Sequence, residues 1–409
     1  MGNELSTLTE EEKRILRHPQ SGQASQFYWA CRNGDVRRVR ELVETIPYED
    51  LNCLEPNGST ALHAAAHGGH VEIVRILLNE QGCRRDRPNC HGLTAYEEAQ
   101  TEEIRQLFHR PSGTNRFCDD KEQESLDLFQ VAKSEDPIPD EDFDKDGYLK
   151  GHGTSEDLNK VRKDQGTGKM LTQSTVGRVL HINTGPLFMY RKYLEKQLRD
   201  LIPADHEEKA KSEMLVQRAF EEENPLFLLR LYTLETPFYR GIGSATMPLL
   251  GSIEGLLYKV KSRYFQGTSY RGLKMTTENL RPYQWSLKKN AAIETKTFCS
   301  TSLERKVAQS FAEASTSGDD KRKTLMIFHF AKRTEQAINL GKISDKEPCI
   351  SEYEDEAEVL VFPETLFFVK QIDMDSSFTL IYLEHLFVRP SSFISGAKGL
   401  YDIMKEKRK

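Results

Sequence analysis

The sequence of 409 residues lacks any long uninterrupted run of apolar residues. A membrane-spanning helix needs about 18 or more of them in succession, so the sequence predicts no such helix. Residues 1–16 also lack the apolar segment of a secretory signal, which leads us to expect a cytoplasmic protein. The seven cysteines are scattered, odd in number and without a Cys-x-x-Cys pair, so we expect reduced thiols rather than a disulfide framework or a zinc site.

The sequence also lacks an excess of basic residues and is poor in apolar ones. Its 57 Lys and Arg are outnumbered by 63 Asp and Glu, which gives a net charge of −6. A nucleic-acid-binding protein normally has a basic footprint, so we expect no nucleic-acid partner. Apolar residues make up only 37% of a chain long enough for two or three domains. This composition indicates folded parts joined by one long polar segment.

A pattern of about 34 residues repeats in the N-terminal part. One copy contains the run Thr60-Ala61-Leu62-His63-Ala64-Ala65, and the next contains Gly92-Leu93-Thr94-Ala95. An earlier, degenerate copy includes Gly34, 35 residues before Gly69. A period near ~33 residues with the pattern T-x-L-H-x-A is typical of ankyrin repeats.

This resemblance to ankyrin repeats covers residues 26–110 and predicts an all-α stack of helical hairpins. One repeat cannot bury its own apolar face, and about three are needed for a stable stack. Ankyrin stacks bind proteins through their concave face, so the resemblance implies a protein partner there. Because the three units form their own core, we expect the stack to be separable from the rest of the chain.

The polar segment is expected at residues 111–175, where Asp, Glu, Lys, Gly and Ser predominate. We interpret it as an acidic flexible linker. Within it, Asp142–Gly147 matches the first half of a calcium loop, but Gly153 stands where a bidentate glutamate is required. The segment therefore predicts a solvated acidic turn and no metal site.

The second half reads as helices followed by strands. Apolar residues recur at helical spacing, which predicts helices at 190–198, 214–220, 226–234 and 249–265. Short runs rich in β-branched and aromatic residues predict strands at 325–330, 359–362, 366–372 and 378–383. Helices first and strands afterwards indicate an α+β domain.

Three motifs occur in order in this half. They are an Arg-Gly pair at Arg271, the run Ser300-Thr301-Ser302, and a glutamate-rich run from Glu352 to Glu358 that leads into the strand at 359–362. Together they resemble the arginine-specific mono-ADP-ribosyltransferases of the R-S-E class over about residues 176–386. The resemblance implies a helical lobe plus a β-sandwich core, NAD as co-substrate, no metal, and a protein substrate with an accessible arginine.

The resemblance assigns NAD binding to five residues. A guanidinium fits paired anionic oxygens, which suits Arg271 to the pyrophosphate of NAD. Gly272 would let the nicotinamide amide approach the backbone, and Ser300 would hold a ribose or the fork of Arg271. In family members the helix after Ser302 directs a residue toward the same pocket, here Phe311. Glu358, the fifth, also acts in catalysis.

Two glutamates are the expected catalytic carboxylates. Cleavage of the nicotinamide–ribose bond builds oxocarbenium character, which a carboxylate beneath the sugar stabilises; the resemblance gives this role to Glu358. Glu356 lies on the same side of an extended chain, because side chains repeat every second residue. The resemblance gives Glu356 the acceptor guanidinium, so that Arg271, Ser300, Glu356 and Glu358 form the catalytic set.

Two ambiguities remain in these motifs. Glutamates at 352, 354, 356 and 358 alternate, so three Glu-x-Glu pairs exist; we select the last because a strand follows it at once. A second Tyr-Arg-Gly, at 239–241, follows Pro237 and precedes a helix, so we interpret Arg240 as part of a structural turn.

The N-terminal sequence Met1-Gly2-Asn3-Glu4-Leu5-Ser6 fits the myristoylation pattern. One acyl chain on Gly2 would give only weak membrane contact, and no basic cluster lies nearby to reinforce it. We expect a cytoplasmic protein that is peripheral to a membrane if Gly2 is acylated.

The sequence therefore predicts a multidomain chain in five parts. They are an N-terminal tail (1–25), ankyrin repeats (26–110), an acidic linker (111–175), a mono-ADP-ribosyltransferase domain (176–390) and a basic C-terminal tail (391–409). The expected activity is transfer of ADP-ribose from NAD to arginine side chains of proteins, with release of nicotinamide. The alternatives are an NAD glycohydrolase that uses the same site and a catalytically silent ankyrin adaptor.

Overall fold

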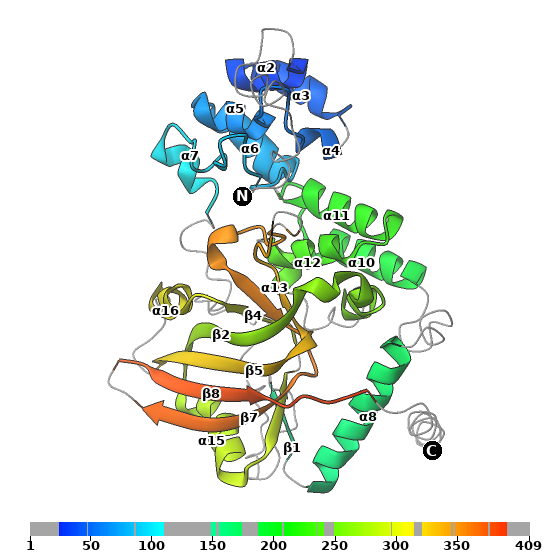
Figure 1. The fold of residues 1–409 in the computed structure, drawn as a ribbon, viewed down its shortest axis with the longest axis vertical. Coiled ribbons are helices and arrows are strands. Elements are labelled where there is room, and N and C mark those ends of the chain that lie inside the picture. The colour runs from blue at the N-terminus through cyan, green and yellow to red at the C-terminus, as the bar shows by residue number, and fades with distance from the viewer. Residues whose placement is uncertain are drawn as a thin grey trace.

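The computed structural model describes residues 24–109, 149–173 and 187–390, apart from gaps at 47, 86, 153–154, 207, 235, 241–248, 296, 315–320, 345–346, 348 and 375–376. Gly2, the candidate calcium loop at 142–153 and the basic tail at 391–409 lie outside the described residues. Along the long axis the chain forms an N-terminal stack of helices, a second group of helices and then a sheet (Figure 1). No helix of the described part is long and apolar enough to cross a bilayer.

The N-terminal stack consists of short antiparallel helices. They are α2 (Gln26–Asn33), α3 (Val36–Val43), α4 (Tyr48–Leu51), α5 (Ala61–His67), α6 (Val71–Arg75), the π-helical turn η1 (Ile76–Glu80) and α7 (Glu102–Gln106). Ser25 caps α2 by accepting from the Tyr28 amide, and Gly34 ends that helix in the left-handed region at φ 76°. The buried apolar residues of the stack form one core of their own, from Phe27 to Phe108.

The T-x-L-H run links neighbouring repeats. His63 Nδ1 lies 2.8 Å from Thr60 Oγ1, which closes a capping box at the start of α5. The other ring nitrogen, Nε2, lies 3.0 Å from the Leu93 carbonyl oxygen in the next repeat. Burial lowers the pKa of His63, so the ring is held neutral between these partners.

The second group of helices, the helical lobe, follows the stack. It contains α10 (Leu187–Leu201), α11 (Lys209–Glu221), α12 (Pro225–Thr233), α13 (Pro237–Arg240) and the 3-10 helix η2 (Leu257–Arg263). Asn224 caps α12 and Pro225 occupies its first turn, where a missing N–H has no cost. The single helix expected at 249–265 is wrong at its C-terminal end, because the chain kinks at Val260 and a strand begins at Tyr264.

Eight strands form one continuously hydrogen-bonded sheet. They are β1 (Leu149–His152), β2 (Tyr264–Met275), β3 (Ala292–Thr295), β4 (Cys299–Ser302), β5 (Arg322–Asn339), β6 (Glu358–Val361), β7 (Leu366–Met374) and β8 (Thr379–His385). Their order is β1-β3-β7-β8-β5-β2-β4-β6, and β5 also pairs with β6. Because the long strand β5 contacts β8, β2 and β6 along its length, the sheet folds back on itself and brings β4 and β6 close to the helical lobe.

Part of the expected linker is folded, which corrects the boundary placed at residue 175. β1 pairs with β3 in antiparallel register, and α8 (Ser155–Gln173) packs Leu158 and Val161 against the cluster that contains Leu366. Lys169 on α8 also forms an ion pair with Glu335 at 3.1 Å. The helix has few apolar residues and polar contacts supply much of its attachment, so composition alone resembled that of a linker.

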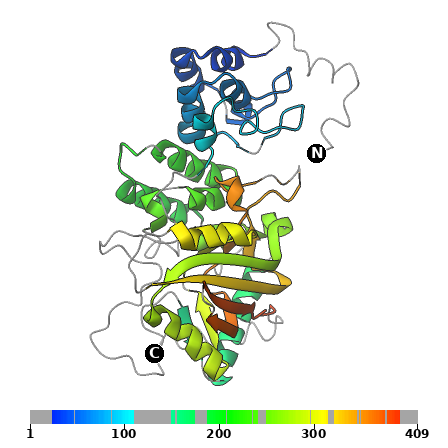
Figure 2. The ribbon, with the colours of Figure 1, turned by 90° about the vertical axis from the view of Figure 1, so that its left-hand side faces the viewer.

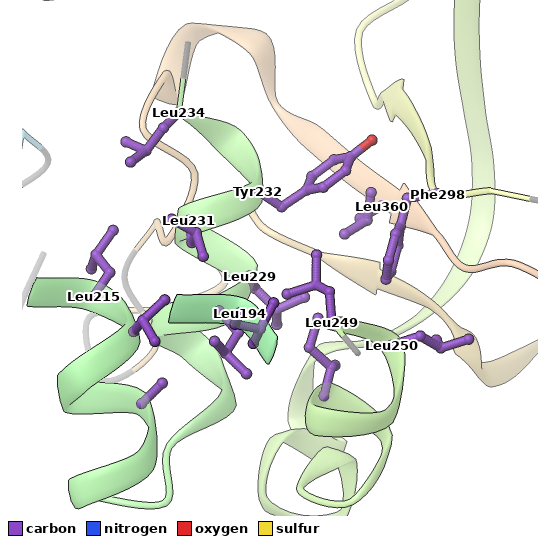
Figure 3. Packing of buried hydrophobic residues seen from close by; sticks show 14 of the residues in the cluster. Leu194, Leu215, Leu229, Leu231, Tyr232, Leu234, Leu249, Leu250, Phe298 and Leu360 are labelled. Atoms are coloured by element: carbon purple, nitrogen blue, oxygen red, sulfur yellow. The ribbon is translucent and has the colours of Figure 1, made fainter. Parts of the chain in front are cut away.

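The expected fold class, helical repeats followed by an α+β domain, is confirmed. Helices α15 (Thr277–Lys289) and α16 (Arg305–Ala314) lie beside the strands (Figure 2). The core of the helical lobe continues into the sheet, because Leu229 and Tyr232 pack in one cluster with Phe298 and Leu360 (Figure 3). Phe298 precedes β4 and Leu360 lies within β6, so the lobe supports the two strands that carry Ser300 and Glu358.

Candidate active site

A pocket of about 250 Å³ of empty space opens beside β2, β4, β6 and α16. Its lining contains every residue that the sequence singled out for the NAD site: Arg271, Gly272, Ser300, Phe311, Glu356 and Glu358. Tyr270, Thr301, Ser302 and Ala308 complete the lining.

Strand pairing brings the three motifs together. In β2 and β4, Tyr270 is paired with Ser302, and in β4 and β6, Ser302 is paired with Glu358. Residues that follow one another across neighbouring strands lie about 5 Å apart. Arginine, serine and glutamate from positions 271, 300 and 358 therefore meet although they are far apart in the sequence.

Arg271 is buried, with 4% of its surface exposed. Its Nη1 donates to the carbonyl oxygen of Ser300 at 2.7 Å and lies 3.6 Å from Cys299 Sγ. The guanidinium is thus anchored on the backbone of β4. The Ser300 hydroxyl itself donates to Glu358.

Two serine hydroxyls hold the Glu358 carboxylate. Ser300 Oγ donates to Oε1 at 2.5 Å, and Ser351 Oγ donates to Oε2 at 3.0 Å. Glu358 is 2% exposed, and hydrogen bonds from two hydroxyls compensate a buried carboxylate for the water that it has lost. Sequence analysis missed Ser351; its only signal was its place directly before the glutamate run.

Glu356 reaches the pocket by a route that the sequence did not predict. The chain is not extended here: Glu354–Glu356 forms a 3-10 turn, η3, and Ala357 takes a left-handed conformation at φ 44° before β6 starts at Glu358. The expectation of Glu356 and Glu358 alternating along a strand is therefore wrong. The left-handed residue between them turns the chain so that both still line one pocket.

Ser302 ties this turn to α16. Its hydroxyl donates to the Glu356 carbonyl oxygen at 2.7 Å and accepts from the Glu304 amide at 2.9 Å. The second serine of the Ser-Thr-Ser run thus stabilises both the start of the helix and the backbone of a pocket glutamate. The hydroxyl of Thr301 is used elsewhere, donating to the Val359 carbonyl oxygen at 2.8 Å.

Gly272 allows α16 to lie directly on β2. A Cβ at this position would stand 1.6 Å from the carbonyl oxygen of Ala308, an overlap with helix backbone. No other residue type fits that approach. Packing is thus a second reason for a glycine here, in addition to the expected approach of nicotinamide to the backbone. The close approach also brings Phe311, one turn further along α16, to the pocket.

The remaining candidates lie elsewhere. Glu352 is fully buried in an ion cluster with Arg85, Lys211 and Arg230, and Glu354 is exposed; neither is among the residues that line the pocket. Arg240, in the second Tyr-Arg-Gly, ends α13. Among the described residues, no group of three or more His, Cys, Asp or Glu is arranged to hold a metal ion.

Comparison with protein families identifies the N-terminal stack. The family described as ankyrin repeats, in three copies, matches residues 27–109, which confirms the ankyrin prediction. The match covers the stack and leaves the helical lobe and the sheet unassigned.

Curated proteins with similar sequences match only short parts of the chain. NAD-capped RNA hydrolase NUDT12 of Macaca fascicularis is 36% identical over 85 residues, which is 21% of this chain and 18% of that protein. Osteoclast-stimulating factor 1 of Monopterus albus is 39% identical over 75 residues, 18% of this chain and 31% of that protein. The chain thus spans less than a third of the length of these relatives.

Solved structures that resemble part of the chain include three bacterial proteins. ADP-ribosyltransferase HopU1 of Pseudomonas syringae pv. Tomato DC3000 has 13% identity and a TM-score of 0.36, covering 48% of this chain and 97% of that one. The Vis toxin, an ADP-ribosyltransferase from Vibrio splendidus, has 17% identity and a TM-score of 0.26, covering 53% and 87%. Exoenzyme S from Pseudomonas aeruginosa has 18% identity and a TM-score of 0.30, covering 52% and 96%.

Proposed function

We propose that the protein transfers ADP-ribose from NAD to arginine side chains of other proteins and releases nicotinamide. The observation that supports this most directly is the carboxylate of Glu358, held by Ser300 and Ser351 in a pocket that Arg271 and Glu356 also line. A fixed and buried carboxylate is suited to stabilising a positive charge that develops during a reaction.

Arg271 would bind the pyrophosphate of NAD. A guanidinium carries five N–H donors in a fixed fork that matches paired anionic oxygens, and one arm of Arg271 is already anchored on the Ser300 carbonyl. That anchor sets the direction of the guanidinium before NAD arrives. Phe311 and the backbone at Gly272 would provide an apolar wall for the nicotinamide end.

The bond between ribose C1′ and the nicotinamide nitrogen would break first. Its electron pair leaves with nicotinamide, which becomes neutral, and the ribose acquires oxocarbenium character. Glu358 would stabilise this cation from the pocket wall, while its hydrogen bonds to the two serines keep the carboxylate from rotating away. A nitrogen of the acceptor guanidinium then forms the new bond to C1′.

Glu356 would serve the acceptor. A free guanidinium has a pKa above ~12 and must lose a proton as its nitrogen attacks C1′. A second carboxylate that lines the same pocket can pair with the guanidinium and accept that proton. If water took the place of the acceptor, the same site would hydrolyse NAD, and the assay below separates these two outcomes.

The ankyrin repeats would recruit a protein partner, as ankyrin stacks do, and the work of the enzyme would take place in the cytoplasm. Weak membrane contact through a myristoyl group on Gly2 remains part of this proposal. A silent adaptor would have no need of a buried arginine, two serines and two glutamates around one pocket, which favours an enzyme over that alternative.

The test is an incubation of the full chain with NAD and agmatine, a small guanidine compound. We expect nicotinamide to be released and ADP-ribose to appear on agmatine, with mass spectrometry measuring both products. Release of nicotinamide with free ADP-ribose alone would identify a glycohydrolase. No nicotinamide release with either agmatine or a protein extract as acceptor would reject the enzymatic proposal.

A further inference from the structure

A cluster of buried charges joins the ankyrin repeats to the rest of the protein. At its centre lies Glu352, whose side chain is fully buried. Its Oε1 accepts from Arg85 Nε at 3.0 Å and from Lys211 Nζ at 3.0 Å, and its Oε2 accepts from Arg230 Nη2 at 2.9 Å. The backbone amide of Glu352 donates to Thr233 Oγ1 at 2.9 Å. The position of this residue is thus fixed on all sides.

The partners of Glu352 come from two separate parts of the chain. Arg85 belongs to the ankyrin stack, where its Nη1 also donates to the Leu107 carbonyl oxygen at 2.9 Å. Lys211 is on α11 and Arg230 is on α12. Lys211 Nζ donates in turn to the Leu78 carbonyl oxygen of the ankyrin stack at 3.0 Å. The stack thus donates a hydrogen bond from Arg85 and accepts one from the helical lobe.

The ankyrin stack and the helical lobe pack closely at this junction. Gly82 lies under the Lys211 side chain, and a Cβ there would stand 2.8 Å from Lys211 Cδ. Lys211 also forms an ion pair with Glu208 at 2.6 Å. The stack has a core of its own, and buried charges join it to the helical lobe at this junction.

Taking charges out of water is costly, so a buried ion cluster adds little net stability, but removing one of its members is strongly destabilising. Burial raises the pKa of Glu352, but attraction by Lys211, Arg230 and Arg85 outweighs it and lowers the pKa overall. The carboxylate is therefore charged, and any movement of the loop that carries it would separate it from three cations.

Two further contacts extend from the ankyrin stack along the same loop. The Arg85 guanidinium lies 5.4 Å from the centre of the Tyr353 ring, within the range of a cation–π contact. His109 Nδ1 lies 2.9 Å from Asp355 Oδ2. Figures 1 and 2 both show the orange ribbon of this region beneath the ankyrin helices. The stack thus contacts residues 352, 353 and 355, directly before Glu356.

We propose that the ankyrin stack, through Arg85 and His109, positions the loop at residues 351–357 and so sets where Glu356 meets the acceptor. Arg85 is then a positioning residue for arginine modification, acting through Glu352 and Tyr353. This inference rests on the function proposed above, because it assigns the stack a part in the transfer step.

The left-handed residue Ala357 makes the loop depend on its surroundings. A non-glycine residue at φ 44° is strained by about 1 kcal/mol or more, and such a conformation persists only when its surroundings determine it. On one side β6 fixes the chain by pairing with β4 and β5. On the other side the loop is held by Ser302, which donates to the Glu356 carbonyl oxygen, and by the Glu352 cluster, to which the ankyrin stack contributes Arg85.

The experiment compares four variants of the full chain with the wild type. Arg85→Ala removes the fork on Glu352, Arg85→Lys keeps the charge without the fork, and His109→Ala removes the half-exposed contact with Asp355. Arg75→Ala is the control, because it breaks a surface ion pair with Glu72 in the same stack. Hydrogen exchange of residues 351–358 and the KM for agmatine are measured for each, together with NAD cleavage in the absence of an acceptor.

In Arg85→Ala we expect faster amide exchange at residues 353–357 and a KM for agmatine that rises by about ten- to a hundredfold, the scale of a displacement near ~1 Å. NAD cleavage should fall by a smaller factor, because Ser300 still holds Glu358. Arg85→Lys should recover part of the loss, and His109→Ala should change both readouts in the same direction by less.

Exchange no faster than in Arg75→Ala would overturn the inference, and so would faster exchange with an unchanged KM. If the wild type cleaves no NAD, the proposed function fails while exchange still decides whether the stack holds the loop. If Arg85→Ala does not fold, Arg85→Lys and His109→Ala decide the question in its place.

Discussion

Ser300 and Glu358 are joined by a hydrogen bond of 2.5 Å between the serine hydroxyl and Oε1 of the carboxylate. The two residues lie on adjacent antiparallel strands whose register is fixed by pairing over the whole of β6. Ser351 holds the other oxygen, so the carboxylate plane has little freedom to rotate. A group fixed in this way needs no reorganisation at the moment a charge develops next to it.

Replacing Glu358 by glutamine should abolish both NAD cleavage and ADP-ribose transfer. The amide keeps the shape of the side chain but loses the negative charge, which should lower the rate by about 10²–10³ or more. Nicotinamide release is the measurement, and the melting temperature checks the fold. Glu354→Gln is the matched control, since Glu354 is exposed and outside the pocket lining. Near-normal turnover in Glu358→Gln would assign the catalytic carboxylate elsewhere.

Replacing Glu356 by glutamine should separate the two reactions. Water attacks an oxocarbenium ion readily, whereas a guanidinium needs a base because its free pKa is above ~12. We therefore expect arginine modification to be lost while much of the NAD hydrolysis survives. Comparing nicotinamide release with ADP-ribose found on agmatine measures both in one assay. An equal loss of both products would mean that Glu356 acts on the sugar or supports Glu358.

Gly272→Ala should destabilise the protein strongly. The added methyl carbon would overlap the backbone of α16, which can be relieved only if the helix moves away from β2. Overpacking in a dense interior commonly costs about 1–3 kcal/mol, and an overlap with backbone lies at or above that range. Gly341→Ala is the control, because its Cβ would approach only the side-chain oxygen of Asn339, at 3.2 Å. Urea denaturation of both variants gives the comparison, and equal stability would contradict the close approach.

The Glu352 cluster should lose its stabilising effect in acid. The folded-state pKa of Glu352 is lowered from its usual value near ~4.3, so its contribution is complete above about pH 4.3 and declines as the pH falls toward the folded pKa. At neutral pH, Glu352→Gln should cost roughly 3–5 kcal/mol, because it removes the anion shared by Arg85, Lys211 and Arg230 and leaves Lys211 with Glu208 alone.

The check is the difference in melting temperature between wild type and Glu352→Gln, measured from pH 7 to pH 3. Glu208 is present in both proteins, but the charge of Glu352 helps to raise its pKa, so Glu208 titrates at lower pH in Glu352→Gln than in the wild type. The difference should be constant above about pH 5 and shrink below about pH 4. A difference that grows in acid would show that Glu352 is not held as a charged group.

The ankyrin repeats and the residues that line the pocket could be predicted from the sequence for a physical reason. The capping and packing of an ankyrin repeat depend on local runs such as Thr60-Ala61-Leu62-His63. Each run can therefore be recognised without knowledge of distant contacts. Arg271, Ser300 and Glu358 each stand in a strand or directly at its end, so their order indicated one site. The roles of the individual pocket residues stay predictions.

Other features depend on contacts that no local pattern contains. Arg85 and Glu352 are 267 positions apart, and nothing near either residue indicates the other. Among the four alternating glutamates, the sequence could not show that Glu352 serves a structural cluster. The left-handed conformation at Ala357 could not be predicted, because the sequence has no glycine at this position. Strand β1 and helix α8 were missed because polar contacts and strand pairing, rather than an apolar face, attach them.

The shared cluster around Glu352 limits how this protein can be rebuilt from parts. A chimera that replaced residues 24–109 with another ankyrin stack would leave Lys211 without the Leu78 carbonyl and Glu352 without Arg85. Grafting would succeed only if the donor stack supplied an arginine, a carbonyl and a glycine at the places of Arg85, Leu78 and Gly82. Recombination between related genes would meet the same barrier, so the stack and the loop at 351–357 are expected to be inherited together.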